Sequence, residues 1–255
     1  MNKFTILGCG SSLGSPWITN YWGKCNPKNP KNLRTRSAAH IQFGKMSILI
    51  DTSPDIKEQF KKNKILNVDA VIYSHEHADQ TAGIFELRPF FWKNKKKIPI
   101  YGNLRTIKAL KKTYNYCFKT NQGYKPILNS HVVKKEFKFT NSKKILKFKS
   151  FPVKHGMITS NVYVFNKIAY ISDCNFISNL YLKHFKNLDY LIIDALRYNK
   201  HPSHFSVDEA INFSNKLKPK KTILTNLHTD LDYSKLRKSL PKNIIPAYDG
   251  LSFNF

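Results

Sequence analysis

The hexapeptide HEHADQ at residues 75–80 constrains this chain more than any other stretch of it. It directly follows the apolar run Ala70–Tyr73, which is typical of a short buried strand, so the motif falls where a strand ends in a loop. Imidazole nitrogen and carboxylate oxygen are ligands that borderline-soft divalent metals accept. Because a loop does not keep the alternation of a strand, His75 and His77 can converge on one ion there. The alternative is a polar loop with chance histidines, and the rest of the chain decides between them.

Short apolar segments alternate with turns and helical stretches along the chain. Ten strands are predicted, with a hairpin turned at Gly44-Lys45: Phe4–Leu7, Ala39–Phe43, Met46–Ile50, Ala70–Tyr73, Ile98–Tyr101, Lys143–Phe148, Val162–Phe165, Lys167–Ile171, Leu188–Ile193 and Thr222–Leu224. Helical periodicity predicts helices at 103–118, 176–186 and 206–217. Hairpins together with strand–helix units favour mixed β-sheets with helices outside them.

Polar side chains stand just past the ends of several predicted strands. They are Asp51, His75, Asp173, Asp194 and His228. In α/β sheets, ligands gather outside the carboxyl ends of the strands. One aspartate at such a place is usually a cap or a turn residue, but five acidic or imidazole groups favour a common site.

The composition points to a soluble protein with a strong positive charge. No apolar run approaches the roughly 18 residues of a membrane span, so we expect no membrane association and a cytoplasmic location. The four cysteines are scattered and indicate reduced thiols. The net charge of +27 comes almost entirely from lysines spread along the chain, without a recognised nucleic-acid motif. It is compatible with a composition bias, a nucleic-acid partner or a small anionic substrate.

With these residues in view, the chain resembles the metallo-β-lactamase superfamily of binuclear hydrolases. The hexapeptide is similar to the family signature H-x-H-x-D-H, and three later positions fit in order and spacing: His155 in VKHG, Asp173 in YISD and His228 in LTNLH. The resemblance implies a single domain over residues 1–255. Its fold would be α/β, an αββα sandwich of two mixed β-sheets flanked by helices.

Finer features resemble the PhnP-like phosphodiesterase branch of that superfamily. They are GSSLGSP at 10–16, RTRS at 34–37, DTSPD at 51–55, GIFELR at 83–88, DALR at 194–197 with HPSH at 201–204, and AYDG at 247–250. The segment HFS at 204–206 also resembles a histidine motif of ribonuclease Z, a related phosphodiesterase.

The resemblance implies two divalent ions, zinc or manganese, that hold a hydroxide for attack on phosphorus. The implied ligands are His75, His77 and His155 for the first ion and Asp79 and His228 for the second. Gln80 is a further candidate ligand of the second ion, and Asp173 is the implied bridge. His204 is expected to contact the phosphate or protonate the leaving oxygen, with His201 as the fallback, and Asp79 is counted with these catalytic groups. Asp51 and Asp194 are expected to orient other groups.

Two departures from the family pattern affect these expectations. Gln80 replaces the sixth-position histidine, and an amide oxygen is a harder and weaker donor than imidazole, so the second ion is expected to bind loosely or to be manganese. Cys25 lacks the companions of a cysteine-rich structural zinc site, so none is predicted.

The function that the sequence favours is hydrolysis of a cyclic or small nucleotide or ribosyl phosphodiester. Three alternatives stay open: a ribonuclease Z-type tRNA 3′-processing endonuclease, a thioester hydrolase of the glyoxalase type, and a metal-binding protein with impaired catalysis. The expected partner is a small anionic phosphodiester substrate, with nucleic acid and a homodimer both left open.

Overall fold

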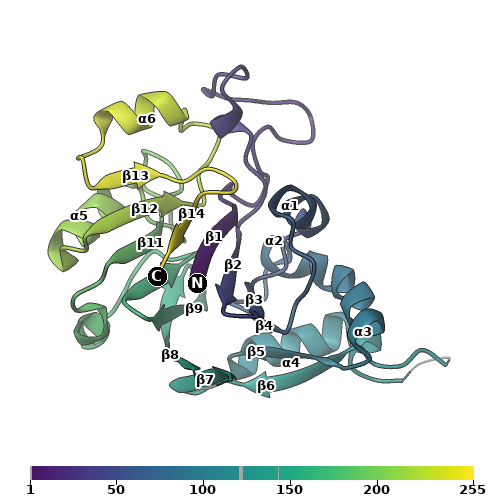
Figure 1. The fold of residues 1–255 in the computed structure, drawn as a ribbon. Coiled ribbons are helices and arrows are strands. Elements are labelled where there is room, and N and C mark those ends of the chain that lie inside the picture. The colour runs from purple at the N-terminus through teal and green to yellow at the C-terminus, as the bar shows by residue number, and fades with distance from the viewer. Residues whose placement is uncertain (1, 121–122, 143) are drawn as a thin grey trace.

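Two seven-stranded sheets packed face to face form the centre of the molecule (Figure 1). The computed structural model describes residues 2–120, 123–142 and 144–255. The first sheet has the order β14-β1-β2-β3-β4-β5-β6, with β1 Asn2–Gly8, β2 Ala38–Phe43, β3 Met46–Ile50, β4 Ala70–Ile72, β5 Ile98–Gly102, β6 Leu128–Val132 and β14 Ser252–Asn254. Strands β3 to β6 run parallel, whereas β14, β1, β2 and β3 pair antiparallel.

The second sheet repeats this mixed pattern. Its order is β13-β12-β11-β10-β9-β8-β7, with β7 Glu136–Asn141, β8 Lys144–His155, β9 Ile158–Phe165, β10 Ile168–Ile171, β11 Tyr190–Asp194, β12 Lys221–Thr225 and β13 Ile244–Pro246. Strands β10 to β13 are parallel, and β7 to β10 are antiparallel.

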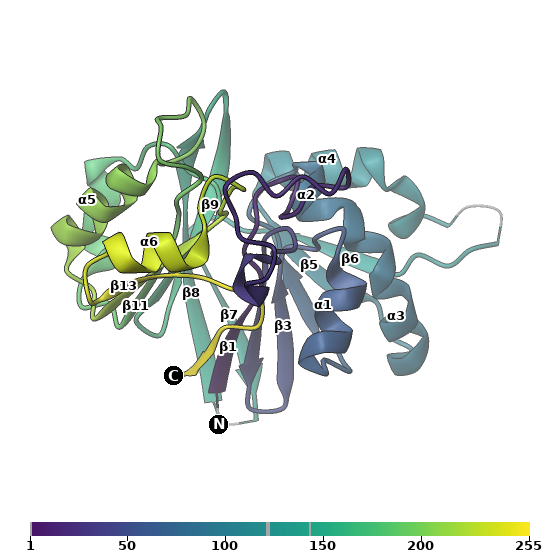
Figure 2. The same cartoon turned by 90° about the horizontal axis from the view of Figure 1, so that it is seen from above.

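Helices cover the outer face of each sheet (Figure 2). On the first sheet lie α1 Ile56–Asn63, α2 Ala78–Thr81, η2 Ala82–Leu87, α3 Arg88–Asn94, α4 Leu104–Thr113 and η3 Asn115–Cys117. On the second lie η4 Asn179–Phe185, α5 Val207–Leu217 and α6 Tyr233–Ser239. The predicted sandwich of two mixed sheets flanked by helices is therefore confirmed.

Alternation of side chains along the strands explains the layers. In β3, Ile48 and Ile50 point into the core between the sheets, while Leu49 packs under the helices of the first sheet. In β12, Ile223 belongs to the same central core, and Leu224 packs toward the helices of the second sheet. Each central strand is buried on both faces, as expected for strands covered by a second sheet and by helices.

Two predicted helices differ from the structure. The segment 103–118 forms α4 and then the separate 3-10 turn η3, because Tyr114 leaves the helical region with φ −114° and ψ 41°. The segment 176–186 forms only the 3-10 turn η4 at Asn179–Phe185, and Phe185 is its one buried residue. The hairpin predicted at Gly44-Lys45 is present between β2 and β3, where Phe43 pairs with Met46.

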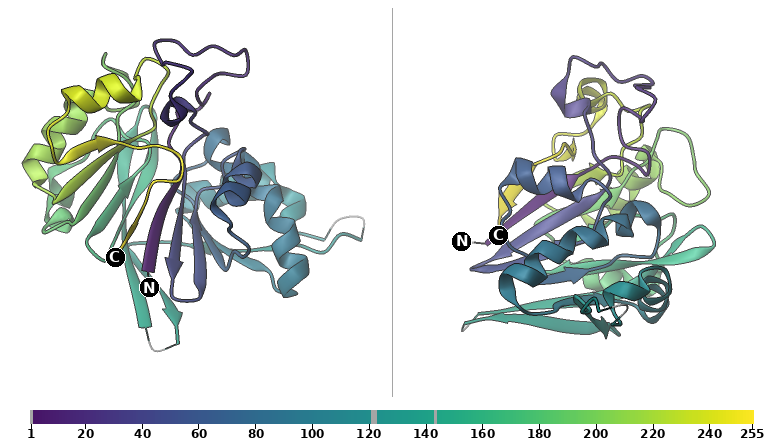
Figure 3. Two further views of the ribbon diagram at one scale, coloured as in Figure 1. Left: turned by 45° about the horizontal axis from the view of Figure 1, so that its top comes forward. Right: turned by 90° about the vertical axis from the view of Figure 1, so that its right-hand side faces the viewer.

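The long connection between β1 and β2 lies against α6 at one end of the sandwich (Figure 3). The short 3-10 turn η1 Pro30–Asn32 lies in this connection, and the backbone N–H of Tyr233 donates to Asn32 Oδ1 at 2.7 Å. Among the helices that the structure describes, none is long and apolar enough to cross a membrane.

Candidate metal centre

The loop after β4 is anchored to both sheets. The backbone N–H of Ser74 donates to Asp51 Oδ1 at 2.7 Å, and the Ser74 carbonyl oxygen accepts from the N–H of Asn161 in β9 at 2.9 Å. The hydroxyl of Tyr163 donates to the carbonyl oxygen of Tyr73 at 2.7 Å. These bonds fix the backbone from which His75 projects, at the edge where the two sheets meet.

Three imidazoles meet at this edge. The rings of His75, His77 and His155 have centroids 4.6 to 5.0 Å apart. His155 stands at the end of β8, and its Nε2 lies 3.2 Å from Nδ1 of His77. One nitrogen from each of the three rings lies within 4.8 Å of the others. The structure thus brings together three of the predicted ligands from two different sheets.

The far nitrogens of two of these rings are held by neighbouring groups. His155 Nδ1 lies 2.7 Å from the carbonyl oxygen of Ser203, to which it can only donate, and His75 Nδ1 lies 3.0 Å from Ser74 Oγ. Burial lowers the pKa of His155 to about 4 and that of His75 well below its usual range. Both rings are therefore neutral near pH 7, which is the form that binds metal.

The donor set fits a divalent cation. His75 Nε2 is fully buried and has no hydrogen-bond partner among the described residues. A buried polar atom without a partner is costly unless another group or ion satisfies it. A neutral imidazole nitrogen facing two further imidazoles and a carboxylate is suited to zinc or a similar ion.

Asp173 joins this group from the second sheet. It follows β10, and its Oδ2 lies 3.6 Å from His155 Nε2, 3.8 Å from His75 Nε2 and 4.0 Å from His204 Nδ1. Burial raises the pKa of the Asp173 carboxyl group, and a bound cation is the kind of partner that favours its ionised form. His155, Asp173 and His204 form a second group whose ligand atoms lie within 4.8 Å of one another.

His204 is oriented by a buried carboxylate. Its Nδ1 lies 2.8 Å from Oδ2 of Asp194 at the end of β11, and Asp194 also accepts from the N–H of Cys174 at 2.9 Å. Burial opposes protonation of His204, but the charges of Asp194 and Asp173 outweigh it and raise its pKa to about 9. Asp194 therefore favours a protonated His204 with Nδ1 engaged, which leaves Nε2 for another contact.

Gln80 lies between two of the predicted acidic ligands. Its Nε2 donates to Asp79 Oδ2 at 3.1 Å and to Asp173 Oδ1 at 3.5 Å, and the side chain is fully buried. Asp79 is not part of either group of converging ligand atoms found among the described residues. The amide thus contacts both carboxylates that were predicted to hold the second ion.

His228 and His201 lie at the margin of the site. The ring of His228 packs edge-on against Trp17 with centroids 5.9 Å apart, and its Nδ1 accepts from the N–H of Asp230 at 3.3 Å. Within the described part of the chain, His228 belongs to neither converging group. His201 accepts from the N–H of Ser203 at 3.3 Å, and its ring centroid lies 5.1 Å from that of His204.

Some supporting groups were not predicted from the sequence. The Ser203 carbonyl that holds His155 carries no signal in the sequence, because any residue offers a carbonyl oxygen. Glu76, inside the hexapeptide, accepts from Arg105 Nε at 2.5 Å and from Thr106 Oγ1 at 3.2 Å, both on α4. Arg34 donates to the carbonyl oxygens of His228 and Leu231, at 3.3 and 2.6 Å, and so holds the segment after β12.

Comparison with known proteins agrees with the fold described above. Residues 47–226, more than half of the chain, match the family described as the Beta-lactamase superfamily domain. A crystal structure of a diphosphatase from the PhnP family is 32% identical with a TM-score of 0.91, covering 100% of this chain and 97% of that one. The chain belongs to the PhnP family of the metallo-β-lactamase superfamily. This family consists of hydrolases built on the fold described above.

Two further relatives add context to this PhnP-family chain. An octanoyltransferase from Porphyromonas gingivalis is 29% identical over 252 residues, which are 96% of this chain and 50% of that protein. The chain therefore spans half the length of this curated relative. Human tRNase Z, short form, is 17% identical with a TM-score of 0.71, covering 99% of this chain and 98% of the other, and this likeness shows the fold alone.

Proposed function

We propose that this chain is a metal-dependent hydrolase that cleaves a phosphodiester or diphosphate bond in a small anionic substrate. The observation that carries the proposal is the convergence of His75, His77, His155 and Asp173 beside the hydrogen-bonded pair of His204 and Asp194. The three imidazoles and the Asp173 carboxylate would bind metal, and the pair of His204 and Asp194 would supply a proton.

Metal-holding roles follow from the donor atoms. His75, His77 and His155 would hold one ion, and Asp173 would be shared with a second ion held by Asp79 and His228. Gln80 would contribute only if its amide oxygen faced that ion, an orientation that depends on the assignment of the two amide atoms. Bound divalent ions supply Lewis acidity that polarises phosphoryl oxygens and favours ionisation of water.

His204 is the proton donor in this proposal. When water attacks phosphorus, a new P–O bond forms, the bridging P–O bond breaks and the departing oxygen takes up a proton. His204, held by Asp194 through Nδ1, would give the proton from Nε2. The low exposure of the His204 side chain, 14%, keeps most water away from this nitrogen.

The proposed substrate class rests on the chemistry of the site residues and on the similarity to a diphosphatase. Phosphodiesters and diphosphates both present a phosphorus atom with a bridging oxygen as leaving group and non-bridging oxygens for cations to hold. The 32% identical relative is a diphosphatase, which supports including diphosphates. The net charge of +27 favours an anionic substrate of either kind.

A substrate panel tests the proposal. The metal-loaded protein is assayed on bis(p-nitrophenyl) phosphate, a dinucleoside diphosphate, a glutathione thioester and a precursor tRNA. We expect turnover of at least one of the first two and none of the thioester. Thioester turnover alone would contradict the proposal, and cleavage of precursor tRNA alone would favour tRNA processing.

The role of His204 has its own test. His204→Ala should retain metal but lose about 10²- to 10⁴-fold in kcat, the usual range for a general acid. His131→Ala, at an exposed histidine of β6, is the matched control and should keep both properties. Full activity in the His204 variant would remove this residue from the mechanism.

A further inference from the structure

The positive charge is concentrated in one segment of the chain. Residues 87–135 contain eleven lysines and two arginines but no aspartate or glutamate, so all sixteen acidic residues lie elsewhere. This segment runs from α3 through β5, α4 and η3 to just beyond β6. The lysines are spread along the chain, but in this segment no acidic residue offsets them, so it carries a strong local positive charge.

These cations face solvent and lack acidic partners. All eleven lysines are exposed, and none of them takes part in a salt bridge among the described residues. Among the described residues of the segment, Arg105 is the only cation that forms a salt bridge, and its partner is Glu76. Exposed lysines without neutralising neighbours create a positive potential that attracts polyanions.

One row of these cations leads away from the metal centre. Arg105, Lys108 and Lys112 occupy positions i, i+3 and i+7 of α4, which places them on one exposed side, while Ile107 and Leu110 pack into the core. The row starts at Arg105, which contacts Glu76 between the two histidines of the hexapeptide. At 1.5 Å per residue it extends about 10 Å along the helix axis.

The row ends at a hollow rich in lysines. This hollow has a volume of about 370 Å³, and its lining includes Lys97, Lys111, Lys112 and Lys119 together with Phe118. It lies beside η3, whose Asn115 is one of its lining residues. Four ammonium groups around one hollow are suited to phosphate groups spaced along a chain.

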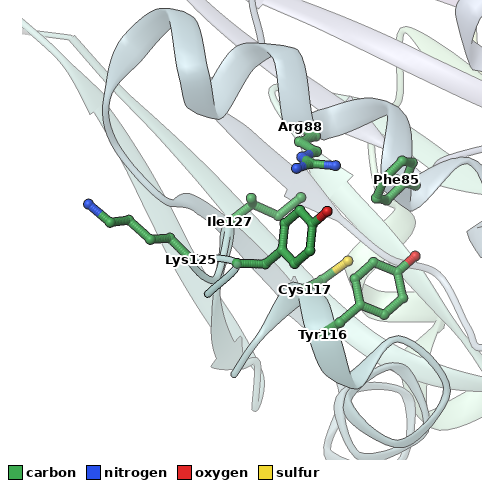
Figure 4. A pocket seen from close by; sticks show the side chains of 7 residues that line it. Phe85, Arg88, Tyr116, Cys117, Lys125 and Ile127 are labelled. Carbon is green, nitrogen blue, oxygen red and sulfur yellow. The ribbon is translucent and has the colours of Figure 1, made fainter. Parts of the chain in front are cut away.

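Exposed aromatic rings gather on the other side of η3. The Arg88 guanidinium carbon lies 4.5 Å from the ring centroid of Trp92, 5.1 Å from that of Tyr124 and 5.6 Å from that of Phe85. These rings and Tyr116 are between 42 and 59% exposed. A pocket of about 300 Å³ lies among them, with Phe85 and Arg88 on one side and Tyr116, Cys117 and Ile127 on the other (Figure 4).

We propose that the surface formed by α3, α4, η3 and Tyr124 binds single-stranded nucleic acid. Lysines along α4 and in the hollow would contact phosphates, and the aromatic pocket at Arg88 would receive an unpaired base by stacking. A duplex would keep its bases from this pocket. A membrane surface is less suited, because the rings line a concave pocket around a guanidinium and do not form a protruding apolar face.

Binding is measured by fluorescence anisotropy with labelled dT15 and rU15 oligonucleotides, which separate DNA from RNA. Excess EDTA is present throughout, so the result does not depend on the proposed hydrolysis. Tyr124→Ala should weaken binding about tenfold, in the range of a lost stacking contact. Lys111→Ala/Lys112→Ala should also weaken binding and make the salt dependence shallower by about 1.4 in slope.

Matched controls keep the test specific. Lys235→Ala/Lys238→Ala removes two exposed lysines from α6, on the other side of the molecule. Phe176→Ala removes an exposed ring from the segment between β10 and η4, outside the proposed surface. Both should bind within about twofold of the native protein. A 15-base-pair duplex should bind more weakly than the single strands.

Three results would overturn the proposal. The first is an equal loss in both lysine pairs, which would mean general attraction by the net charge. The second is duplex binding as tight as single-strand binding with no effect of Tyr124→Ala. The third is association with vesicles containing anionic lipid, sensitive to the same variants, without binding of either oligonucleotide.

Discussion

His75 and Gln80 belong to the same hexapeptide, yet His75 offers an acceptor nitrogen to a cation whereas Gln80 offers hydrogen-bond donors. His75 offers a buried nitrogen without a hydrogen-bond partner in the described structure, whereas Gln80 donates its amide N–H groups to Asp79 and Asp173. An amide that donates hydrogen bonds to two carboxylates occupies the place where the family pattern has an imidazole for the second ion. This chain should therefore bind a first metal ion much more tightly than a second one.

Gln80→His tests that difference. The native protein should retain about one zinc ion per chain after dialysis against a mild chelator, and the variant about two, because imidazole is the stronger ligand. Metal content is measured by elemental analysis of both proteins at equal concentration. Two tightly held ions in the native protein would show that Gln80 does not weaken the second site.

His40, far from the hexapeptide in sequence, gives a pH-dependent prediction. Burial lowers its pKa to about 4, and its Nε2 lies 2.7 Å from Ser47 Oγ. The folded protein keeps this ring neutral while the unfolded chain protonates near pH 6.5, so stability is present above that pH and is lost toward pH 4. From pH 7 to pH 5 the native free energy of unfolding should fall by about 2 kcal/mol more than that of His40→Gln.

This difference is measured by urea unfolding of both metal-free proteins at the two pH values. His131→Gln, at an exposed position, should follow the native protein. Parallel pH dependence of the native protein and His40→Gln would show that His40 is not buried in the neutral form.

At the scale of elements, α4 supports the loop that carries the histidines. Arg105 and Thr106 at its first turn both donate to Glu76, and Asn103 caps the helix by accepting from the N–H of Thr106 at 2.8 Å. The helix end and the loop are thus fixed to each other. Such supporting contacts around ligands commonly affect metal affinity by about 10- to 100-fold.

Arg105→Ala is expected to weaken zinc binding by up to about tenfold, since Arg105 is half exposed and Thr106 still holds Glu76. Competition with a chromogenic chelator measures the affinity. Lys108→Ala removes the same charge one turn along α4 and should leave zinc affinity within about twofold. Equal losses in the two variants would indicate a general charge effect.

Elements were predictable where burial and periodicity agreed. Strands β3 and β12 are apolar runs buried on both faces, so their sequences carry a clear signal. The segment 176–186 has a helical pattern, but Leu180 is 78% exposed and only Ile177 and Phe185 are buried, so packing does not favour a full α-helix. Tyr114 ends α4 because the chain then turns to bury Cys117, which periodicity alone does not reveal.

At the scale of the whole molecule, the site exists because two sheets place strand ends at one edge. His75 and Asp51 come from the first sheet, while His155, Asp173 and Asp194 come from the second. The family resemblance predicted these residues in their order along the chain. Parallel strands end at the same edge of a sheet, which explains why the residues lie together. The contact of Gln80 with both carboxylates and the position of His228 against Trp17 depend on packing between distant segments, which the sequence does not specify.

Metal-restored hydrolysis is the first measurement to make on this protein, because the proposed chemistry depends on a bound divalent ion. Chelator-stripped protein is assayed on bis(p-nitrophenyl) phosphate before and after addition of Zn²⁺ or Mn²⁺, with His75→Ala in parallel. We expect no turnover in stripped protein, turnover on addition of metal, and neither metal retention nor turnover in the variant. Turnover that is independent of metal, or equal activity in His75→Ala, would contradict it.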